Sequence, residues 1–74
     1  MEAYYIQQTK GSEEKHLIIF SSYEKAQAYL EEYAKNMGYE VKKNEDGIVT
    51  GAIFNNVRRN IVVILTIEKL EIYE

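Results

Sequence analysis

Apolar and polar residues alternate along most of the chain, and one central segment instead follows helical spacing. The alternation over residues 3–9 predicts a strand. The aliphatic run over 16–20 is typical of a short strand buried on both faces. Because residues 10–15 between them are polar, we expect a turn there. The first quarter of the chain therefore predicts two strands joined by a turn.

The central segment predicts one amphipathic helix over residues 22–37. Ser21 is the expected N-cap, and Glu24 three residues later completes a capping box. Gly38 is suited to the left-handed position that ends a helix. The residues expected to face the core share one stripe at helical spacing: Tyr23, Ala26, Leu30, Tyr33, Ala34 and Met37.

Three further strands are predicted after the helix. Residues 39–43 and 48–55 alternate as strands, and Asp46-Gly47 between them favours a hairpin turn. Gly51 inside the second of these strands indicates a bulge or a close backbone approach. A turn over 56–59 precedes the last strand. The pattern predicts a single α+β domain over 1–74: an antiparallel sheet of about five strands with one helix on one face, in the order ββαβββ.

The last strand is expected to run from Asn60 to Tyr73. Its apolar residues change parity between Ile67 and Leu70, which predicts a bulge or bend at Glu68-Lys69.

Both faces of that strand are apolar over residues 61–65, so both are expected to be covered by other parts of the protein or by a partner. One helix, about 10 Å wide, covers only part of one face of a sheet about 24 Å across. Small domains without disulfides or metals commonly gain stability by association. We therefore expect a homodimer, or a docked partner, through the last strand. The expected interface residues are Val62, Ile64, Leu70, Ile72 and Tyr73.

Composition narrows the possible functions. Nine basic and twelve acidic residues give a net charge of −3, which argues against general nucleic-acid binding. The chain has no cysteine and one histidine, so that a thiolate or multi-histidine site is excluded. No signal peptide or membrane-spanning segment is visible, since the longest apolar stretch is residues 61–65. We expect a cytoplasmic protein that does not contact membranes.

No residue pattern marks a catalytic, metal or cofactor site. His16 has no nucleophile or orienting carboxylate beside it in the sequence, and Glu13 and Glu14 lie on a polar turn that makes a poor chelate. The isolated glycines do not form a phosphate-binding loop. We therefore expect no enzyme activity, no cofactor and no metal.

Two features favour a binding role. Arg58 and Arg59 are the only arginines, and they lie together at a predicted turn between Asn56 and Asn60. Guanidinium and amide groups suit phosphates or carboxylates, although arginines here also suit the protection of the flanking apolar strand from aggregation. The chain also has seven tyrosines, which suit either an interface or the boundary of a small core. The candidate binding residues are Arg58, Arg59, Asn56, Asn60 and Tyr29.

Residues 17–29 contain a strand ending in Phe-Ser-Ser and a helix opening Glu-Lys-Ala. This segment resembles small phage and prophage accessory proteins of low-GC bacteria. The resemblance implies a protein that binds a host factor, for instance in defence evasion, in the host cytoplasm. We expect a non-enzymatic binding protein that blocks a host protein. The alternatives are an oligomeric binder of an anionic nucleotide, with Arg58 and Arg59 around the ligand, and a structural or regulatory small subunit.

Overall fold

The computed structural model describes residues 2–11 and 13–71, with the backbone alone at 15–17. One helix and five strands follow one another in the predicted order ββαβββ, and the α+β fold is confirmed. The elements are β1 (Glu2–Lys10), β2 (Glu13–Phe20), α1 (Tyr23–Met37), β3 (Glu40–Lys43), β4 (Val49–Asn56) and β5 (Ile61–Glu71).

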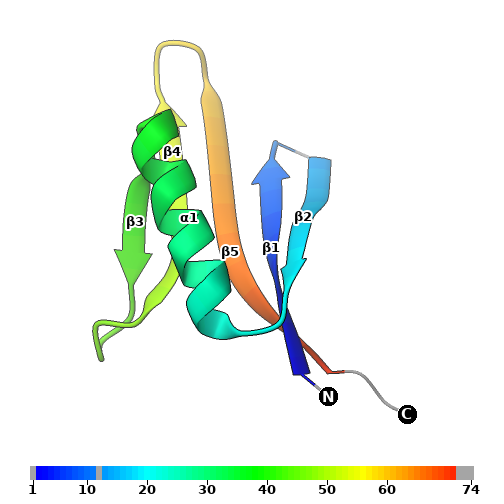
Figure 1. The fold of residues 1–74 in the computed structure, drawn as a ribbon. Coiled ribbons are helices and arrows are strands. Elements are labelled where there is room, and N and C mark those ends of the chain that lie inside the picture. Colours follow the sequence, from blue (N-terminus) through cyan, green and yellow to red (C-terminus); the bar gives the residue numbers. More distant parts are fainter. Residues whose placement is uncertain (1, 12, 72–74) are drawn as a thin grey trace.

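The strands form one antiparallel sheet in the order β2-β1-β5-β4-β3. The first and last strands pair along the middle of the sheet, from Glu2 opposite Glu71 to Lys10 opposite Val63. The helix connects β2 at one edge to β3 at the other, and so crosses one face of the sheet (Figure 1). Over residues 63–66, β5 is paired along both edges, with β1 and with β4, and only its two faces remain there for other contacts.

The core lies between α1 and the middle of the sheet. Leu30 and Ala34 on the helix pack against Ile6 on β1 and Leu65 on β5, and all four are almost fully buried. The buried hydrophobic residues of the described chain are Ala3, Ile6, Ala26, Leu30, Ala34, Val49, Ala52, Val63 and Leu65. Four of these nine are alanines, so the core is thin for a domain without disulfides.

The helix begins one residue later than the sequence predicts. Ser22, not Ser21, is the N-cap: its backbone is extended, and its side-chain oxygen accepts a hydrogen bond of 3.3 Å from the Lys25 backbone N–H. The Ser21 hydroxyl oxygen instead accepts a bond of 3.1 Å from the Lys25 ammonium. Gly38 ends the helix at φ 75°, as predicted. Met37, which the stripe placed in the core, is 52% exposed because it lies on the last turn, next to that end.

The cap gives a first testable prediction. Replacing Ser22 with Ala removes the acceptor for one helical N–H and is expected to lower the free energy of unfolding by about 1 kcal/mol. Ser21→Ala is the matched control, because its exposed bond to an ammonium contributes little. Urea titrations followed by circular dichroism measure both. Equal losses in the two variants would contradict the assignment of the cap.

The prediction that β2 is buried on both faces is wrong. Ile18 and Ile19 are 45% and 64% exposed. The reason is the strand order, which puts β2 at the edge of the sheet, whereas α1 packs over the middle. A strand rich in aliphatic residues is here an edge strand, and its pairing with β1 is interrupted by a register shift between Tyr5 and Gln7.

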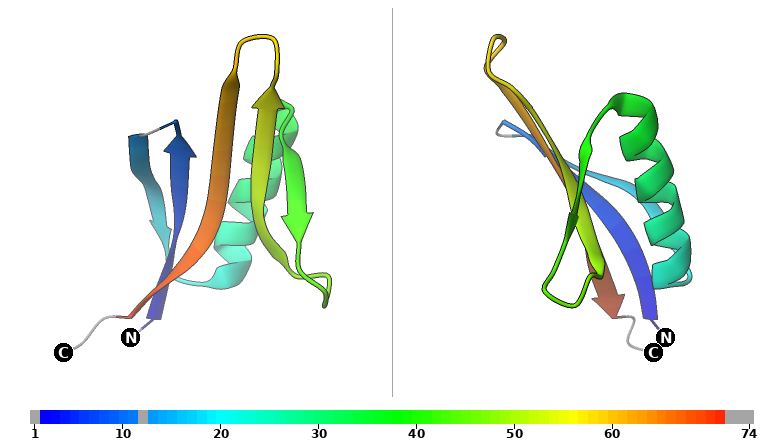
Figure 2. Two further views of the ribbon diagram at one scale, coloured as in Figure 1. Left: turned by 180° about the vertical axis from the view of Figure 1, so that it is seen from behind. Right: turned by 90° about the vertical axis from the view of Figure 1, so that its left-hand side faces the viewer.

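Of the bulge or bend predicted at Glu68-Lys69, the bulge is wrong. The pairing of β5 with β1 runs through Tyr5 opposite Glu68 and Tyr4 opposite Lys69 without a register shift, and β5 curves smoothly instead (Figure 2). Because the alternation is continuous, Leu70 lies on the face of the sheet opposite α1. The parity of the apolar residues changes in the sequence because those at odd positions up to Ile67 face α1, whereas Leu70, at an even position, lies on the opposite face.

The last strand begins at Ile61, and Asn60 belongs to the preceding turn. Ile72 and Tyr73, which the sequence assigned to this strand and to the interface, lie outside the described residues. In the part of the chain that the structure describes, no helix is long and apolar enough to cross a bilayer.

Candidate functional site

The hairpin of β4 and β5 extends past the rest of the sheet. Its two strands stay paired at Asn55 opposite Val62 and at Asn56 opposite Ile61. The pairing with β1 already ends at Val63, and that with β3 at Ile53. Residues 55–62, which we call the arginine hairpin, therefore project as a two-stranded ribbon (Figure 1). The molecule is accordingly elongated, with extents of 47 × 27 × 22 Å.

Hydrogen bonds define the tip of the arginine hairpin. The Asn56 side-chain oxygen accepts a bond of 3.2 Å from the Arg59 backbone N–H. The Asn60 N–H donates to the Val57 carbonyl oxygen at 3.3 Å. Asn60 adopts φ 54°, a left-handed conformation that asparagine tolerates better than most residues. The two asparagines thus form the turn that presents Arg58 and Arg59, which brings together four of the five candidate binding residues.

The side chains at this tip are exposed. Val57 is 84% exposed, and both arginines are exposed. Across residues 2–11 and 13–71, ion pairs join Glu2 to Lys69 at 2.7 Å and Glu40 to Lys42 at 3.2 Å, and neither includes an arginine of the tip. The Lys69 ammonium lowers the pKa of Glu2 through its hydrogen bond and charge. The tip therefore exposes two guanidinium groups and one apolar side chain.

Tyr29, the fifth candidate, does not lie at the tip. It lies on α1, where its ring centroid is 5.4 Å from that of Phe20 and 6.2 Å from that of Tyr33. The contacts continue from Tyr33 to Tyr39 at 5.8 Å and from Tyr39 to Phe54 at 5.2 Å. Five rings thus connect β2, α1 and β4 at the boundary of the core.

The tyrosines of this region act in packing. Burial raises the pKa of Tyr39, with a further contribution from Tyr33. Burial also raises the pKa of Tyr23, whose hydroxyl donates a hydrogen bond to the Val49 carbonyl oxygen and so ties the start of α1 to β4. The i, i+4 spacing of Tyr29 and Tyr33 was the sequence signal for their contact, whereas Phe54 could not be joined to them without the strand order.

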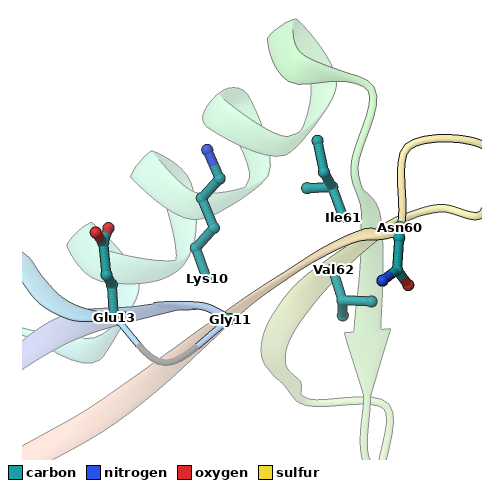
Figure 3. A pocket seen from close by; sticks show the side chains of 6 residues that line it. All are labelled: Lys10, Gly11, Glu13, Asn60, Ile61 and Val62. Atoms are coloured by element: carbon teal, nitrogen blue, oxygen red, sulfur yellow. The ribbon is translucent and has the colours of Figure 1, made fainter.

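An open pocket of about 520 Å³ lies beside the arginine hairpin. It is lined by Lys10, Gly11, Glu13, Asn60, Ile61 and Val62. Lys10 and Glu13 are opposite each other in the register of β1 and β2, and their side chains rise on the same side of the sheet as α1 (Figure 3). Because one is cationic and the other anionic, this pocket is not a positively charged cradle.

The exposed apolar positions of β5 lie on the face of the sheet away from α1. Val62 and Ile64 are each 41% exposed and Leu70 is 37% exposed, and the first two alternate with the buried Val63 and Leu65. The structure thus groups three of the five expected interface residues on one face.

A search of the described residues for three or more His, Cys, Asp or Glu side chains that could hold a metal ion finds no such group. Comparisons with protein-family models, with curated proteins and with solved structures find no match for the chain. The resemblance of residues 17–29 to phage and prophage accessory proteins stays a prediction.

Proposed function

We propose that this chain is a non-enzymatic binding protein that holds a protein partner through the tip of the arginine hairpin. The observation that carries the proposal is that a projecting, hydrogen-bonded turn exposes Arg58 and Arg59 outside any ion pair of the described chain. Val57 beside them is 84% exposed and offers an apolar contact. Arginine is enriched among the residues that dominate binding energy at interfaces.

The chemistry of the tip favours a partner that presents carboxylates. Guanidinium groups bind carboxylates through two parallel hydrogen bonds, which are stronger than bonds between neutral groups. A nucleic acid fits less well, because its binding usually requires several cations along the backbone and this chain carries a net charge of −3. An acidic depression on a protein surface matches two adjacent arginines and one apolar side chain.

The class of the partner follows from the resemblance of residues 17–29 to phage accessory proteins. We propose that the partner is a host protein whose acidic surface is blocked, and that the chain acts in the host cytoplasm as an accessory or anti-defence factor. Blocking requires only occupation of the surface, so the proposed role needs no reaction centre.

Removing both arginines tests the proposal. We expect Arg58→Ala/Arg59→Ala to weaken binding of the partner recovered from a low-GC bacterial lysate by about 2 kcal/mol, or about 30-fold in Kd. Stability should change by less than about 0.5 kcal/mol, because exposed charges contribute little to folding. Calorimetry measures the affinity and urea titration measures the stability.

The matched control is Lys35→Ala/Lys43→Ala, which removes the same two charges from exposed positions outside the arginine hairpin. The control is expected to bind as the wild type does. Equal losses in the two double variants would show a dependence on net charge alone and would contradict a role for the tip.

The nucleotide alternative gives a different result in a melting experiment. A nucleotide sponge is stabilised by its ligand, and the melting temperature rises with ligand concentration. Because Lys10 and Glu13 oppose each other in the neighbouring pocket, we expect ATP and GTP at millimolar concentration to leave the melting temperature unchanged. A rise of several degrees that disappears in Arg58→Ala/Arg59→Ala would favour the nucleotide alternative.

A further inference from the structure

The sheet has one face that α1 does not cover, and we call it the back face. Figure 2 shows the helix on one side of the sheet and no element of the described chain packed on the other. The apolar residues that define the back face are Ile19, Ile53, Val62, Ile64 and Leu70, and all but the half-buried Ile53 are exposed by 37% or more. Exposed apolar residues on one uncovered face of a sheet favour an interaction site there.

The centre of the back face carries no charge. Ile64 lies on the central strand, with Thr9 opposite it on β1 and Ile53 opposite it on β4. The charged residues at back-face positions lie on the two edge strands or near the end of β5: Glu14, Glu40, Lys42 and Glu68. A centre without charged residues and a charged margin is the usual composition of an interface between proteins.

Because the core contains few large side chains, we expect the back face to be covered by a partner that is bound at all times. Of the nine buried hydrophobic residues in the part of the chain that the structure describes, only five are larger than alanine. A 74-residue chain buries a smaller share of its surface than a larger domain does, and domains of this size commonly gain stability from a further source such as association. A partner met only on binding a host cannot stabilise the free protein, whereas a second copy of the chain is always present.

We propose that the back face is covered by a second copy of this chain, in a symmetric dimer of two sheets packed face to face. Five strands about 4.8 Å apart and about eight residues long give a face of roughly 24 × 26 Å, or roughly 600 Å² per copy. The pair buries roughly 1,200 Å², which reaches the lower end of the range for stable interfaces. Two chains with a net charge of −3 meet here without burying like charges at the centre.

The arrangement keeps both binding tips accessible. The turn at 57–60 lies beyond the last pair of β4 and β5, whereas the dimer contact uses the body of the sheet. The dimer therefore presents two arginine hairpins, and a partner with two acidic sites is bound with a raised effective concentration. The dimer itself does not depend on the proposed function of the tip.

Sedimentation equilibrium between about 1 and 100 μM tests the dimer. The wild type is expected to sediment as a dimer at the upper concentration. Ile64→Lys places a charge at the centre of the contact, and we expect it to raise the dissociation constant at least tenfold while circular dichroism shows a folded chain. Met37→Lys is the matched control, because Met37 is 52% exposed on the helix and outside the back face, and it should associate as the wild type does.

Two further variants and the wild type itself also test the dimer. If Ile64→Lys does not fold, Ile64→Thr keeps a β-branched residue and must still weaken association at least threefold. Arg58→Ala/Arg59→Ala should dimerise like the wild type. The experiment therefore distinguishes an error in the proposed binding role of the tip from an error in the proposed dimer. A wild-type protein that is a folded monomer at 100 μM, or an Ile64 variant that dimerises unchanged, would overturn the proposal and leave the back face to a different protein.

Discussion

Replacing Leu30 with Ala is expected to lower the free energy of unfolding by about 2–5 kcal/mol. Leu30 is fully buried, and it belongs to the cluster that includes Ile6 and Leu65 from the two central strands. A truncated side chain loses its contacts and leaves a cavity, which the rigid sheet cannot close by relaxing. Because the core contains few large side chains, we expect the loss to fall in the upper half of this range.

Urea titration at a fixed protein concentration measures this effect. Met37→Ala is the control on the same helix, because Met37 is 52% exposed and its truncation should cost less than about 1 kcal/mol. If Leu30→Ala were within about 1 kcal/mol of the wild type, the face of α1 assigned to the core would be wrong.

Adding one methyl group at Gly51 is expected to destabilise the protein by about 3 kcal/mol or more. A Cβ atom there would lie 2.0 Å from the Leu65 carbonyl oxygen and 3.3 Å from the Thr66 Cα atom. Both atoms belong to the backbone of β5, so no side-chain rotation relieves the clash. Strands β4 and β5 must separate, which makes the cost larger than that of ordinary overpacking.

Gly47→Ala is the control for Gly51→Ala. Gly47 has φ 79°, so alanine there is strained, but a Cβ meets nothing within 4 Å. Its expected cost is about 1 kcal/mol, from the backbone conformation alone. Thermal melts of both variants give the comparison. A Gly51→Ala protein as stable as Gly47→Ala would contradict the close approach of β4 to β5.

Local signals in the sequence predicted the local structure well. The apolar stripe and Gly38 located α1 to within one residue at its start, where two adjacent serines offered equivalent caps. Gly51 was correctly predicted to mark a close backbone approach, because only a missing side chain makes that position tolerable. These features depend on residues near one another in the chain.

The errors concern contacts between distant residues. The exposure of Ile18 and Ile19 depends on which strand forms the edge of the sheet, and the strand order is not encoded in the alternation of any one strand. The apolar positions of β5 looked interrupted because Ile67 faces α1 and Leu70 faces away. A second apolar face and a bulge produce the same change of parity in the sequence.

The sequence indicated most residues of the arginine hairpin, but not that the hairpin projects from the sheet. Arg58 and Arg59 were predicted in a turn over residues 56–59, and the structure places them in a turn that also includes Asn60. Their projection depends on where β1 and β3 stop, at Lys10 and Glu40, which no feature near the arginines indicates. Tyr29 was grouped with them by composition alone, and the structure places it in the packing of α1.

The most direct test of the account is site-specific photocrosslinking of the arginine hairpin to its partner in a low-GC bacterial lysate. A photoreactive amino acid is placed at position 57, at the exposed tip, or at position 45, in the exposed turn between β3 and β4. We expect one host protein to be crosslinked from position 57 and not from position 45, and the product to be lost in Arg58→Ala/Arg59→Ala. Identical products from both positions, or a product that survives the loss of both arginines, would contradict a partner held by the tip.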